Sequence, residues 1–305
     1  MEIYFAPLQG FTDFVFRNSH AKYFSGVDKY FAPFLRVEKG EVRKKDRTDL
    51  ISSKNKEIII PQIIANCKDD VVILVQFIEN QGFKNCDLNF GCPFPLQTKH
   101  FYGAGIWDKP QKVEEVLSAL KQFPQMSFSL KMRLGNTSVS QTLDLIDVIN
   151  SADLQFVTVH PRLAAQMYDG EINFSAFEVL YEKIQKPVVY NGDLKTVSDI
   201  DNISKKYPKL KAVMIGRGLI ANPFLAENFV NKNFDFDKHR FLLFHDLLID
   251  NYLQLYNNSE FMVLDKMKTF WTYSFRDKKL LKKIKKAKSL QEYNSFAVMT
   301  VLEKE

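Results

Sequence analysis

Eight short apolar segments, each followed by a stretch with helical periodicity, restrict the fold of this sequence more than any other feature. Their first residues lie 25 to 42 positions apart, which leaves room for a strand, a helix and two loops in each unit. The segments span residues 3–8, 29–35, 58–65, 86–90, 128–134, 156–160, 187–192 and 212–218. Such an alternation predicts a parallel sheet covered by helices.

Eight repeated units favour a closed (β/α)8 barrel over an open sheet, so we predict an α/β fold of the TIM-barrel type. Residues 69–82 and 112–123 show the apolar periodicity of helices that would cover the barrel. A doubly wound sheet is the alternative, and it would place a G-x-G-x-x-G turn after its first strand. The first turn here reads QGFTD, at residues 9–13, which is not that motif.

The pattern changes after about residue 232, because no further strand candidate follows. Residues 239–256 and 261–275 have helical periodicity, and the segment NKNFDFDKH at 231–239 is typical of a linker. We therefore predict two domains, a catalytic barrel at residues 1–232 and a small all-helical domain at residues 238–305.

The 3 cysteines, Cys67, Cys86 and Cys92, are odd in number and lack the spacing of zinc ligands, so we expect reduced thiols and no metal site. The first residues, MEIYFAP, have no basic region before an apolar core, which argues against a secretory signal. No apolar run approaches the ~20 residues of a membrane span. These features predict a cytoplasmic monomer without a membrane partner.

Polar residues stand at the carboxyl end of nearly every predicted strand, which is where barrels of this kind carry their active sites. Burying so many polar side chains costs free energy unless a ligand or a hydrogen-bond network satisfies them. They are Gln9, Arg36, Gln62, Asn89, Cys92, Lys131, Arg133, His160, Arg162, Asn191, Asp193, Gly216, Arg217 and Gly218. The motifs NGD and IGRG follow the last two strands, a common place for phosphate in barrels, so we predict a ligand that carries phosphate.

Strand parity separates two of the cysteines. Cys86 and Asn89 point to opposite faces of their strand, so an inward-facing Asn89 would leave Cys86 against the helices. Cys92 lies beyond the strand, on a loop over the barrel mouth, and its neighbours Gly91 and Pro93 restrict its direction. We interpret Cys92 as the candidate reactive residue.

The motifs along the barrel together resemble those of the tRNA-dihydrouridine synthases. They occur in order as APLQGFTDFVFR (6–17), PQIIA (61–65), DLNFGCP (87–93), GAGIWDKP (103–110), LKMRLG (130–135), VHPRLAAQMYDG (159–170), NGDL (191–194) and VMIGRGLIANP (213–223). The segment DKMKTFWTYSF at 265–275 resembles the helical domain of the bacterial branch that acts near position 16 of the D-loop. Two departures are Leu8-Gln9, where the family usually has Met-Glu, and Pro161, where it more often has glycine.

The resemblance implies FMN as cofactor and NADPH or NADH as electron donor. Lys131 would then stabilise negative charge on the reduced flavin. The cofactor-binding residues it implies are Ala6, Pro7, Leu8, Gln62, Lys131 and His160, with Asn191, Asp193, Gly216 and Arg217 at the phosphate end. It also implies that Arg36, Asn89, Tyr168 and Arg162 contact the uracil of a nucleotide flipped out of tRNA.

Cys92 resembles the family's proton donor. Reduction of the uracil C5–C6 bond needs a hydride at C6, from N5 of reduced FMN, and a proton at C5. A thiol with a pKa near 8.5 is about 97% protonated at pH 7 and can therefore act as an acid. We also expect the loop at 94–106, with Gly103 and Gly105, to close over the site.

The segment RDKKLLKKIKKAK at 276–288 carries eight basic residues and one acidic residue. A solvated helix face is the simpler interpretation of a lysine run, but an enzyme that reads a base in folded RNA needs a surface for phosphates. We predict that tRNA is bound by Arg276, Lys279, Lys282, Lys283 and Lys286, helped by Arg43, Lys44, Lys45 and Arg47.

Three other functions remain open on the sequence. A small-molecule flavoenzyme of the dihydroorotate dehydrogenase type would share the flavin barrel but would not need the basic helical domain. A Schiff-base aldolase would use Lys131 as its nucleophile and the phosphate site for a sugar phosphate. A non-catalytic RNA-binding barrel would have no use for Cys92, Lys131 and His160 together.

Overall fold

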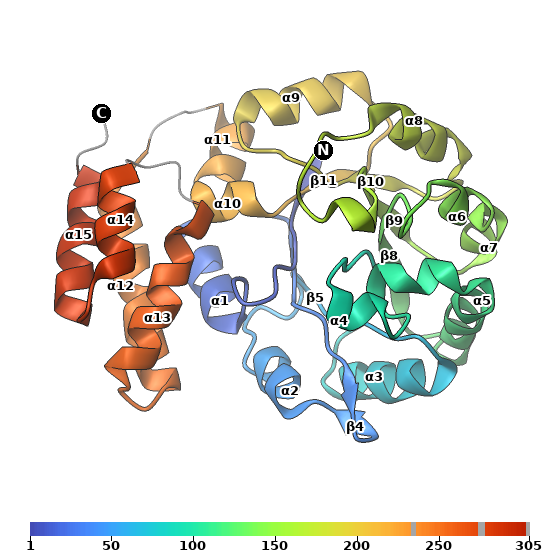
Figure 1. Cartoon of the computed structure of the whole chain (residues 1–305), viewed down its shortest axis with the longest axis horizontal. Coiled ribbons are helices and arrows are strands. Elements are labelled where there is room, and N and C mark those ends of the chain that lie inside the picture. Colours follow the sequence, from blue (N-terminus) through green and yellow to red (C-terminus); the bar gives the residue numbers. More distant parts are fainter. Residues whose placement is uncertain (233–235, 274–277, 303–305) are drawn as a thin grey trace.

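The computed structural model of the protein describes residues 1–232, 236–273 and 278–302, and it shows strands encircled by helices with further helices packed on one side (Figure 1). Part of the predicted linker, residues 233–235, lies outside the described residues. Arg276, one of the predicted tRNA-binding residues, also lies outside them.

The central sheet is a closed parallel barrel, as the sequence predicts. Its strands are β1 (Glu2–Phe5), β2 (Lys29–Phe31), β5 (Ile59–Ile60), β6 (Gln62–Ile63), β7 (Asn85–Phe90), β8 (Ser127–Arg133), β9 (Phe156–His160), β10 (Val188–Tyr190) and β11 (Ala212–Ile215). The hydrogen-bonded order is β5-β2-β1-β11-β10-β9-β8-β7-β6, and every pair is parallel. Because β5 and β6 are two parts of one strand on either side of Pro61, the two ends of this order are continuous and the sheet closes.

The strands predicted at 86–90, 128–134 and 156–160 are confirmed to within one residue at each end, whereas the other five are shorter than predicted. Prolines account for two of these differences. Pro61 has no N–H to donate to the ladder, so the strand predicted at 58–65 is divided. The strand predicted at 29–35 ends at Phe31, two residues before Pro33.

Helices follow the strands and form the outer layer (Figure 1). The longer ones of the barrel are α1 (Phe14–Tyr23), α3 (Lys68–Asn80), α5 (Pro110–Ala119), α7 (Ile146–Ser151), α8 (Phe174–Lys183), α9 (Val197–Lys206), α10 (Arg217–Ala221) and α11 (Leu225–Asn231). Short turns in the loops are α4 (Pro95–Thr98), η1 (Gly103–Asp108), η2 (Leu120–Gln122), α6 (Ser140–Leu143) and η3 (Ala164–Gln166). The helices predicted at 69–82 and 112–123 correspond to α3 and to α5 with η2.

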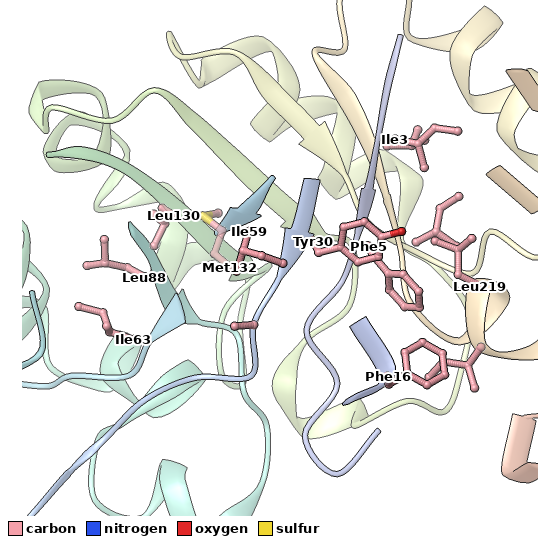
Figure 2. Close-up of a cluster of buried hydrophobic side chains, with 14 of the residues drawn as sticks. Ile3, Phe5, Phe16, Tyr30, Ile59, Ile63, Leu88, Leu130, Met132 and Leu219 are labelled. Atoms are coloured by element: carbon pink, nitrogen blue, oxygen red, sulfur yellow. The ribbon is translucent and has the colours of Figure 1, made fainter. Parts of the chain in front are cut away.

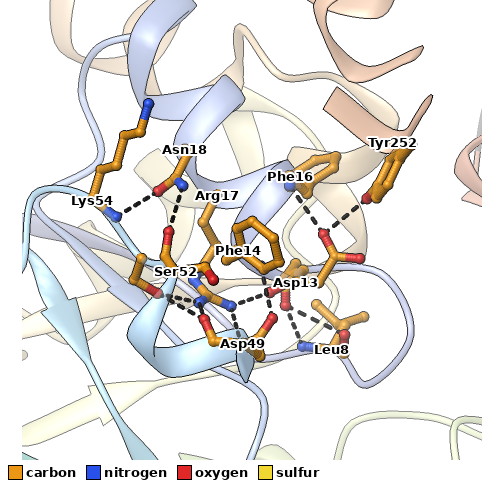
Figure 3. A network of polar contacts seen from close by, with 12 residues as sticks. Leu8, Asp13, Phe14, Phe16, Arg17, Asn18, Asp49, Ser52, Lys54 and Tyr252 are labelled. Carbon is orange, nitrogen blue, oxygen red and sulfur yellow. Dashed lines mark hydrogen bonds and ion pairs between the residues drawn. The ribbon is translucent and has the colours of Figure 1, made fainter. Parts of the chain in front are cut away.

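An insertion between β2 and β5 was not predicted from the sequence. It consists of the antiparallel hairpin β3 (Val37–Glu38) and β4 (Glu41–Val42), followed by α2 (Lys44–Ile51). The buried guanidinium of Arg17 binds this insertion to α1, because it forms an ion pair with Asp49 at 3.0 Å (Figure 3). The insertion therefore has a fixed place beside the barrel mouth.

Side chains alternate along each strand, and this separates two apolar cores. Ile3 and Phe5 of β1 point toward the helices and join the large outer core, part of which Figure 2 shows. The inner core, inside the barrel, consists of Tyr4, Ala6, Phe31, Ile60, Val189, Ala212 and Met214. Because Ala6 and Met214 also line the cavity described below, the inner core forms part of the cavity floor.

The helices after the barrel are α12 (Lys238–Leu255), α13 (Glu260–Phe270) with η4 (Trp271–Tyr273), α14 (Lys278–Lys286) and α15 (Leu290–Leu302). The first two match the helices predicted at 239–256 and 261–275, and α14 is formed by the basic segment. They share the outer core of the barrel, so the predicted division into two domains stays a prediction. Within the described part of the chain, no helix is long and apolar enough to cross a membrane.

Asp13 ties these helices to the barrel (Figure 3). Its carboxylate caps α1 and also accepts a hydrogen bond of 2.8 Å from the hydroxyl of Tyr252 in α12. Lys266 of α13 adds an ion pair with Asp13 at 2.7 Å. These contacts hold η4 beside the first barrel loop, where the rings of Tyr273 and Phe11 lie 4.9 Å apart between centroids.

Candidate active site

A cavity of about 540 Å³ opens at the carboxyl ends of the barrel strands. Its wall includes nearly all the site residues predicted from the sequence. These are Ala6, Pro7, Leu8, Arg36, Gln62, Asn89, Cys92, Lys131, His160, Tyr168, Asn191, Asp193, Gly216 and Arg217. Among the described residues, no cluster of His, Cys, Asp and Glu suited to a metal ion is present.

A chain of buried polar side chains forms the floor between β6, β7 and β8. The carboxylate of Asp87 accepts hydrogen bonds from Oγ of Ser129 and from Nε2 of Gln62, both at 2.6 Å. Nδ2 of Asn89 donates to Oε1 of Gln62 at 2.7 Å, and Oδ1 of Asn89 accepts the backbone N–H of Cys92 at 2.8 Å. The chain therefore links a buried carboxylate to the loop that carries Cys92.

Cys92 faces the cavity and is only 9% exposed. Burial raises the pKa of its thiol, and the opposing effects of the Phe94 backbone and of the Arg133 and Lys131 charges are smaller. The thiol is therefore protonated at neutral pH. Cys86 lies in the outer core, as strand parity predicts.

The segment at 94–106 is folded against Cys92 as α4 and the start of η1. Gly103 has a φ of 56°, and a Cβ at this position would lie 2.8 Å from Cβ of Cys92. A Cβ on Gly105 would lie 2.4 Å from the carbonyl oxygen of Thr98. Both glycines are thus needed for close packing around Cys92, and the expected closure of this loop stays a prediction.

Lys131 and Arg133 project from the same face of β8 into the cavity. Burial, and then the charge of Arg133, lowers the pKa of Lys131 to about 8, although the carboxylate of Asp87 opposes this shift. Burial also lowers the pKa of Arg133 to about 10. Two cations held side by side in this way would be stabilised by an anionic ligand.

His160 is neutral at pH 7, because burial and then the charges of Arg133 and Lys131 lower its pKa well below the usual value. Nη1 of Arg162 lies 3.3 Å from Nε2 of this ring. A guanidinium can only donate, so Nε2 is the acceptor and the ring proton lies on Nδ1. His160 therefore offers one N–H donor, at Nδ1.

Asp193, after β10, binds two arginines. Its carboxylate accepts a hydrogen bond of 2.6 Å from Nη2 of Arg217 and pairs through its other oxygen with Arg162. Arg162 is 3% exposed, donates to the carbonyl of Gly170 at 2.8 Å, and lies behind the cavity wall instead of in it. A direct contact between Arg162 and the uracil would require it to leave these partners.

Tyr168 stands at the mouth of the cavity, between two guanidinium groups. The guanidinium carbons of Arg133 and Arg217 lie 5.1 and 5.3 Å from its ring centroid. The ring of Phe94 lies 6.5 Å away between centroids, and both aromatic residues are exposed. The mouth therefore presents flat aromatic surface beside positive charge.

The family profile described as "Dihydrouridine synthase (Dus)" matches residues 4–301 of this chain. The chain belongs to the dihydrouridine synthase family. Among curated relatives, tRNA-dihydrouridine synthase B of Pasteurella multocida is 25% identical over 226 residues, 73% of this chain and 67% of that protein. The tRNA-dihydrouridine(16) synthase of Neisseria meningitidis serogroup B is 27% identical over 233 residues, 73% of this chain and 69% of that protein.

Solved structures support the barrel fold of this dihydrouridine synthase. Morphinone reductase superposes with a TM-score of 0.55 at 11% identity, covering 78% of this chain and 87% of that chain. A variant of NCR from Zymomonas mobilis superposes with a TM-score of 0.53 at 12% identity, covering 78% and 88%. At such identities the likeness concerns the fold alone.

Several cavity residues of this dihydrouridine synthase received no role from the sequence. They are Phe34, Phe94, Arg133, Lys195 and Tyr273. Arg133 had a usable signal, because it shares its strand face with Lys131. No sequence pattern of the barrel could have indicated Tyr273, because this residue comes from η4 and reaches the cavity only through the packing of α12 and α13 on α1.

The basic helix α14 begins five residues after Tyr273 and turns its charged side outward. Lys282, Lys283 and Lys286 are exposed, whereas Leu280 and Ile284 are buried. Of the other predicted tRNA-binding residues, Lys279, Lys44 and Lys45 are exposed and Arg47 pairs with Glu41 at 3.7 Å. Arg43 pairs with Asp46 at 2.6 Å and also lines the cavity.

Proposed function

We propose that this protein reduces a specific uridine of tRNA to 5,6-dihydrouridine, with FMN as bound cofactor and NADPH or NADH as electron donor. The observation that carries the proposal is the presence of a protonated thiol, Cys92, in the same cavity as the cations Lys131, Arg133 and Arg217. Membership of the family, and the names of its relatives, support tRNA as the substrate.

The donor groups of the cavity fit FMN, which carries a phosphate and becomes more negative on reduction. The lining includes six Lys and Arg residues against the single carboxylate of Asp193, which is already paired with Arg217. Gly216 lines the cavity, and a Cβ there would lie 3.0 Å from Cδ1 of Leu8, so a glycine lets the backbone border the cavity without displacing Leu8. We assign Asn191, Asp193, Gly216 and Arg217 to the phosphate end.

Away from the phosphate end of the cavity, the flavin ring would be held by Gln62, Lys131 and His160. Ala6, Pro7 and Leu8 would lie beside the ring. Bound FMN would supply the hydride that C6 of the uracil accepts. Lys131 places a positive charge in the cavity before reaction begins, so no reorganisation is needed where negative charge develops. Neutral His160 adds an N–H donor without a second charge.

The base itself would be held and protonated by the chain's own side chains. We propose that Asn89 and Arg36 bind the polar edge of the uracil and that Tyr168 contacts the uracil from the mouth of the cavity. Cys92 then donates the proton of its Sγ to C5. The raised pKa of the thiol keeps this proton in place until it is needed, and burial keeps water from competing.

The exposed lysines of α14 would bind tRNA phosphates next to the cavity, together with basic residues of α2. We further propose a D-loop uridine near position 16 as the target, on the resemblance of residues 265–275. Relatives whose names print different positions, 16 and 20a/20b, match this chain at similar identity, so the choice depends on that segment.

The visible absorption spectrum of the purified protein, before and after FMN is added, is the first test. We expect a bound-flavin spectrum. A Schiff-base aldolase, for which the lowered pKa of Lys131 would also be suitable, predicts a colourless protein that borohydride traps with its substrate. A dihydroorotate-type enzyme would bind flavin but would be reoxidised by a small molecule and not by tRNA. A protein that binds no flavin with FMN in excess would refute the proposal.

FMN affinity is expected to fall as the pH rises above about 8. In the free protein Lys131 loses its proton near pH 8. In the proposed site the ammonium of Lys131 donates to acceptors of the flavin ring and lies in the same cavity as the FMN phosphate, and both favour its charged form. Binding above this pH therefore takes up a proton, and the Kd should rise by up to about tenfold per pH unit. Fluorescence titration of flavin-free protein at pH 7, 8 and 9 measures this. Lys131→Met should bind more weakly with little pH dependence, and a constant wild-type Kd would contradict the role of Lys131.

A further inference from the structure

We propose that Asp87 is a positioning residue that sets the direction of the hydrogen bonds beneath the cavity and thereby holds the loop that carries Cys92. The inference deepens the proposed function, on which it rests for the role of Cys92 as proton donor. Asp87 does not line the cavity, so any effect on the chemistry must pass through its neighbours.

The direction of these hydrogen bonds follows from which side-chain groups can donate and which can only accept. A carboxylate only accepts hydrogen bonds, so Gln62 must turn Nε2 toward Asp87, which leaves Oε1 for Asn89. Asn89 must then donate through Nδ2, which leaves Oδ1 as the acceptor. That oxygen accepts the backbone N–H groups of Gly91, at 3.1 Å, and Cys92, at 2.8 Å.

The opposite direction is incompatible with this loop conformation. A flipped Gln62 would place its oxygen against the carboxylate of Asp87 and its NH2 group against Asn89. Asn89 would then have to flip as well, and its NH2 group would face the two backbone N–H groups at Gly91 and Cys92. Donors would meet donors, and the loop would have to move.

Burial makes the direction consequential, because water has little access to replace a wrong partner. Gln62 and Asp87 are fully buried, and Ser129 and Asn89 are 3% and 8% exposed. A polar network without access to water is stable only when every member is satisfied. Burial raises the pKa of Asp87 to about 6, and the hydrogen bonds from Gln62 and Ser129 and the charge of Lys131 oppose this shift, so the carboxylate that the network requires is the main form at pH 7.

The same direction determines what the cavity floor offers to a ligand. Each of the two amides, Gln62 and Asn89, uses its oxygen and one N–H within the chain of hydrogen bonds, and each keeps a second N–H. Both side chains line the cavity. With the ammonium of Lys131, the floor consists of donors, which matches a ligand edge made of carbonyl oxygens and ring nitrogens.

The test is the alkylation rate of Cys92 by iodoacetamide in flavin-free protein, measured by mass spectrometry. Asp87→Asn replaces one acceptor oxygen by an NH2 group at constant shape, so either Gln62 faces a donor or the Ser129 hydroxyl loses its acceptor. The direction is then no longer enforced, and the alkylation rate is expected to rise by up to about tenfold, the factor for one lost buried hydrogen bond. Ser129→Ala is the matched control, because it removes a hydrogen bond to the same carboxylate without touching Gln62, and it should stay close to wild type. Cys86, in the outer core, reports general unfolding.

A double variant distinguishes a role of Asp87 in the direction of the hydrogen bonds from a merely structural role. In Asp87→Asn combined with Gln62→Glu, the new amide at position 87 can donate to the new carboxylate at position 62. The other carboxylate oxygen again accepts from Asn89, so the loop should return to nearly the wild-type alkylation rate. A merely structural role predicts that the second substitution adds damage.

The outcomes decide between these alternatives. The proposal is overturned if Asp87→Asn and Ser129→Ala behave alike, if the double variant reacts as fast as Asp87→Asn, or if Cys86 reacts together with Cys92. No tRNA or flavin enters the assay, so a wild-type protein that makes no dihydrouridine would refute the proposed function and leave this result standing. In turnover, Asp87→Asn should lower the rate of reduction at unchanged tRNA affinity.

Discussion

Replacement of Cys92 by alanine is expected to lower the rate of dihydrouridine formation by about 10²–10⁴-fold, the usual contribution of a positioned general acid. The thiol lies in the cavity, is protonated at neutral pH and has its backbone held by Asn89. FMN content and flavin reduction by NADPH or NADH should remain, because neither requires a proton at C5 of the base. Single-turnover reduction of tRNA by pre-reduced protein measures the first quantity, and stopped-flow absorbance measures the second.

Cys67→Ala is the matched control for this experiment. Cys67 occupies the N-cap position of α3 without a side-chain capping hydrogen bond and does not line the cavity, so its replacement should leave both rates unchanged. Formation of dihydrouridine at the native rate by Cys92→Ala would show that another group supplies the proton. Loss of flavin reduction in the same variant would mean that Cys92 supports the cofactor instead of the substrate.

Charge reversal on α14, with Lys282, Lys283 and Lys286 replaced by glutamate, is expected to weaken tRNA binding and flatten its salt dependence. Each lost phosphate contact reduces the slope of log K against log salt by ~0.7–0.9, so the triple variant should lose about 2–3 units. The three side chains are exposed, and the apolar residues of α14 that are buried are left intact. Filter binding of tRNA at several salt concentrations measures both effects, while flavin reduction should be unchanged.

The control makes the same change of charge elsewhere. Lys121 in η2, Lys205 in α9 and Lys209 in the loop after α9 are exposed where the chain leads into the amino ends of strands, on the barrel face opposite the cavity. Their replacement by glutamate alters the net charge equally and should leave the salt slope nearly unchanged. Equal losses in the two triple variants would mean that overall charge governs binding, and no loss in either would make α14 a solvated face.

The barrel and the position of its site could be predicted because both depend on local patterns. Alternation of strand and helix is determined by residues close in the chain, and strand parity sends Asn89 inward and Cys86 outward without reference to distant partners. Parallel strands share one carboxyl edge, so residues such as Lys131 and His160 meet there once the fold class is known.

The tertiary structure decided the features that require contacts between distant segments. Closure of the barrel requires the strand interrupted at Pro61 to pair with β2 through β5 and with β7 through β6. Tyr273 reaches the cavity because Asp13 and Lys266 join the helical part to α1. Arg162 has the spacing of a cavity residue, yet it turns behind the wall to bind Asp193.

The direction of the hydrogen bonds from Asp87 to the Cys92 loop is another feature that only the tertiary structure decided. The motif DLNFGCP contains Asp87, Asn89 and Cys92, but Gln62 and Ser129, which complete the chain, come from other strands. A sequence specifies which groups can donate or accept. Which donor faces which acceptor is settled only when burial removes water and brings the partners together.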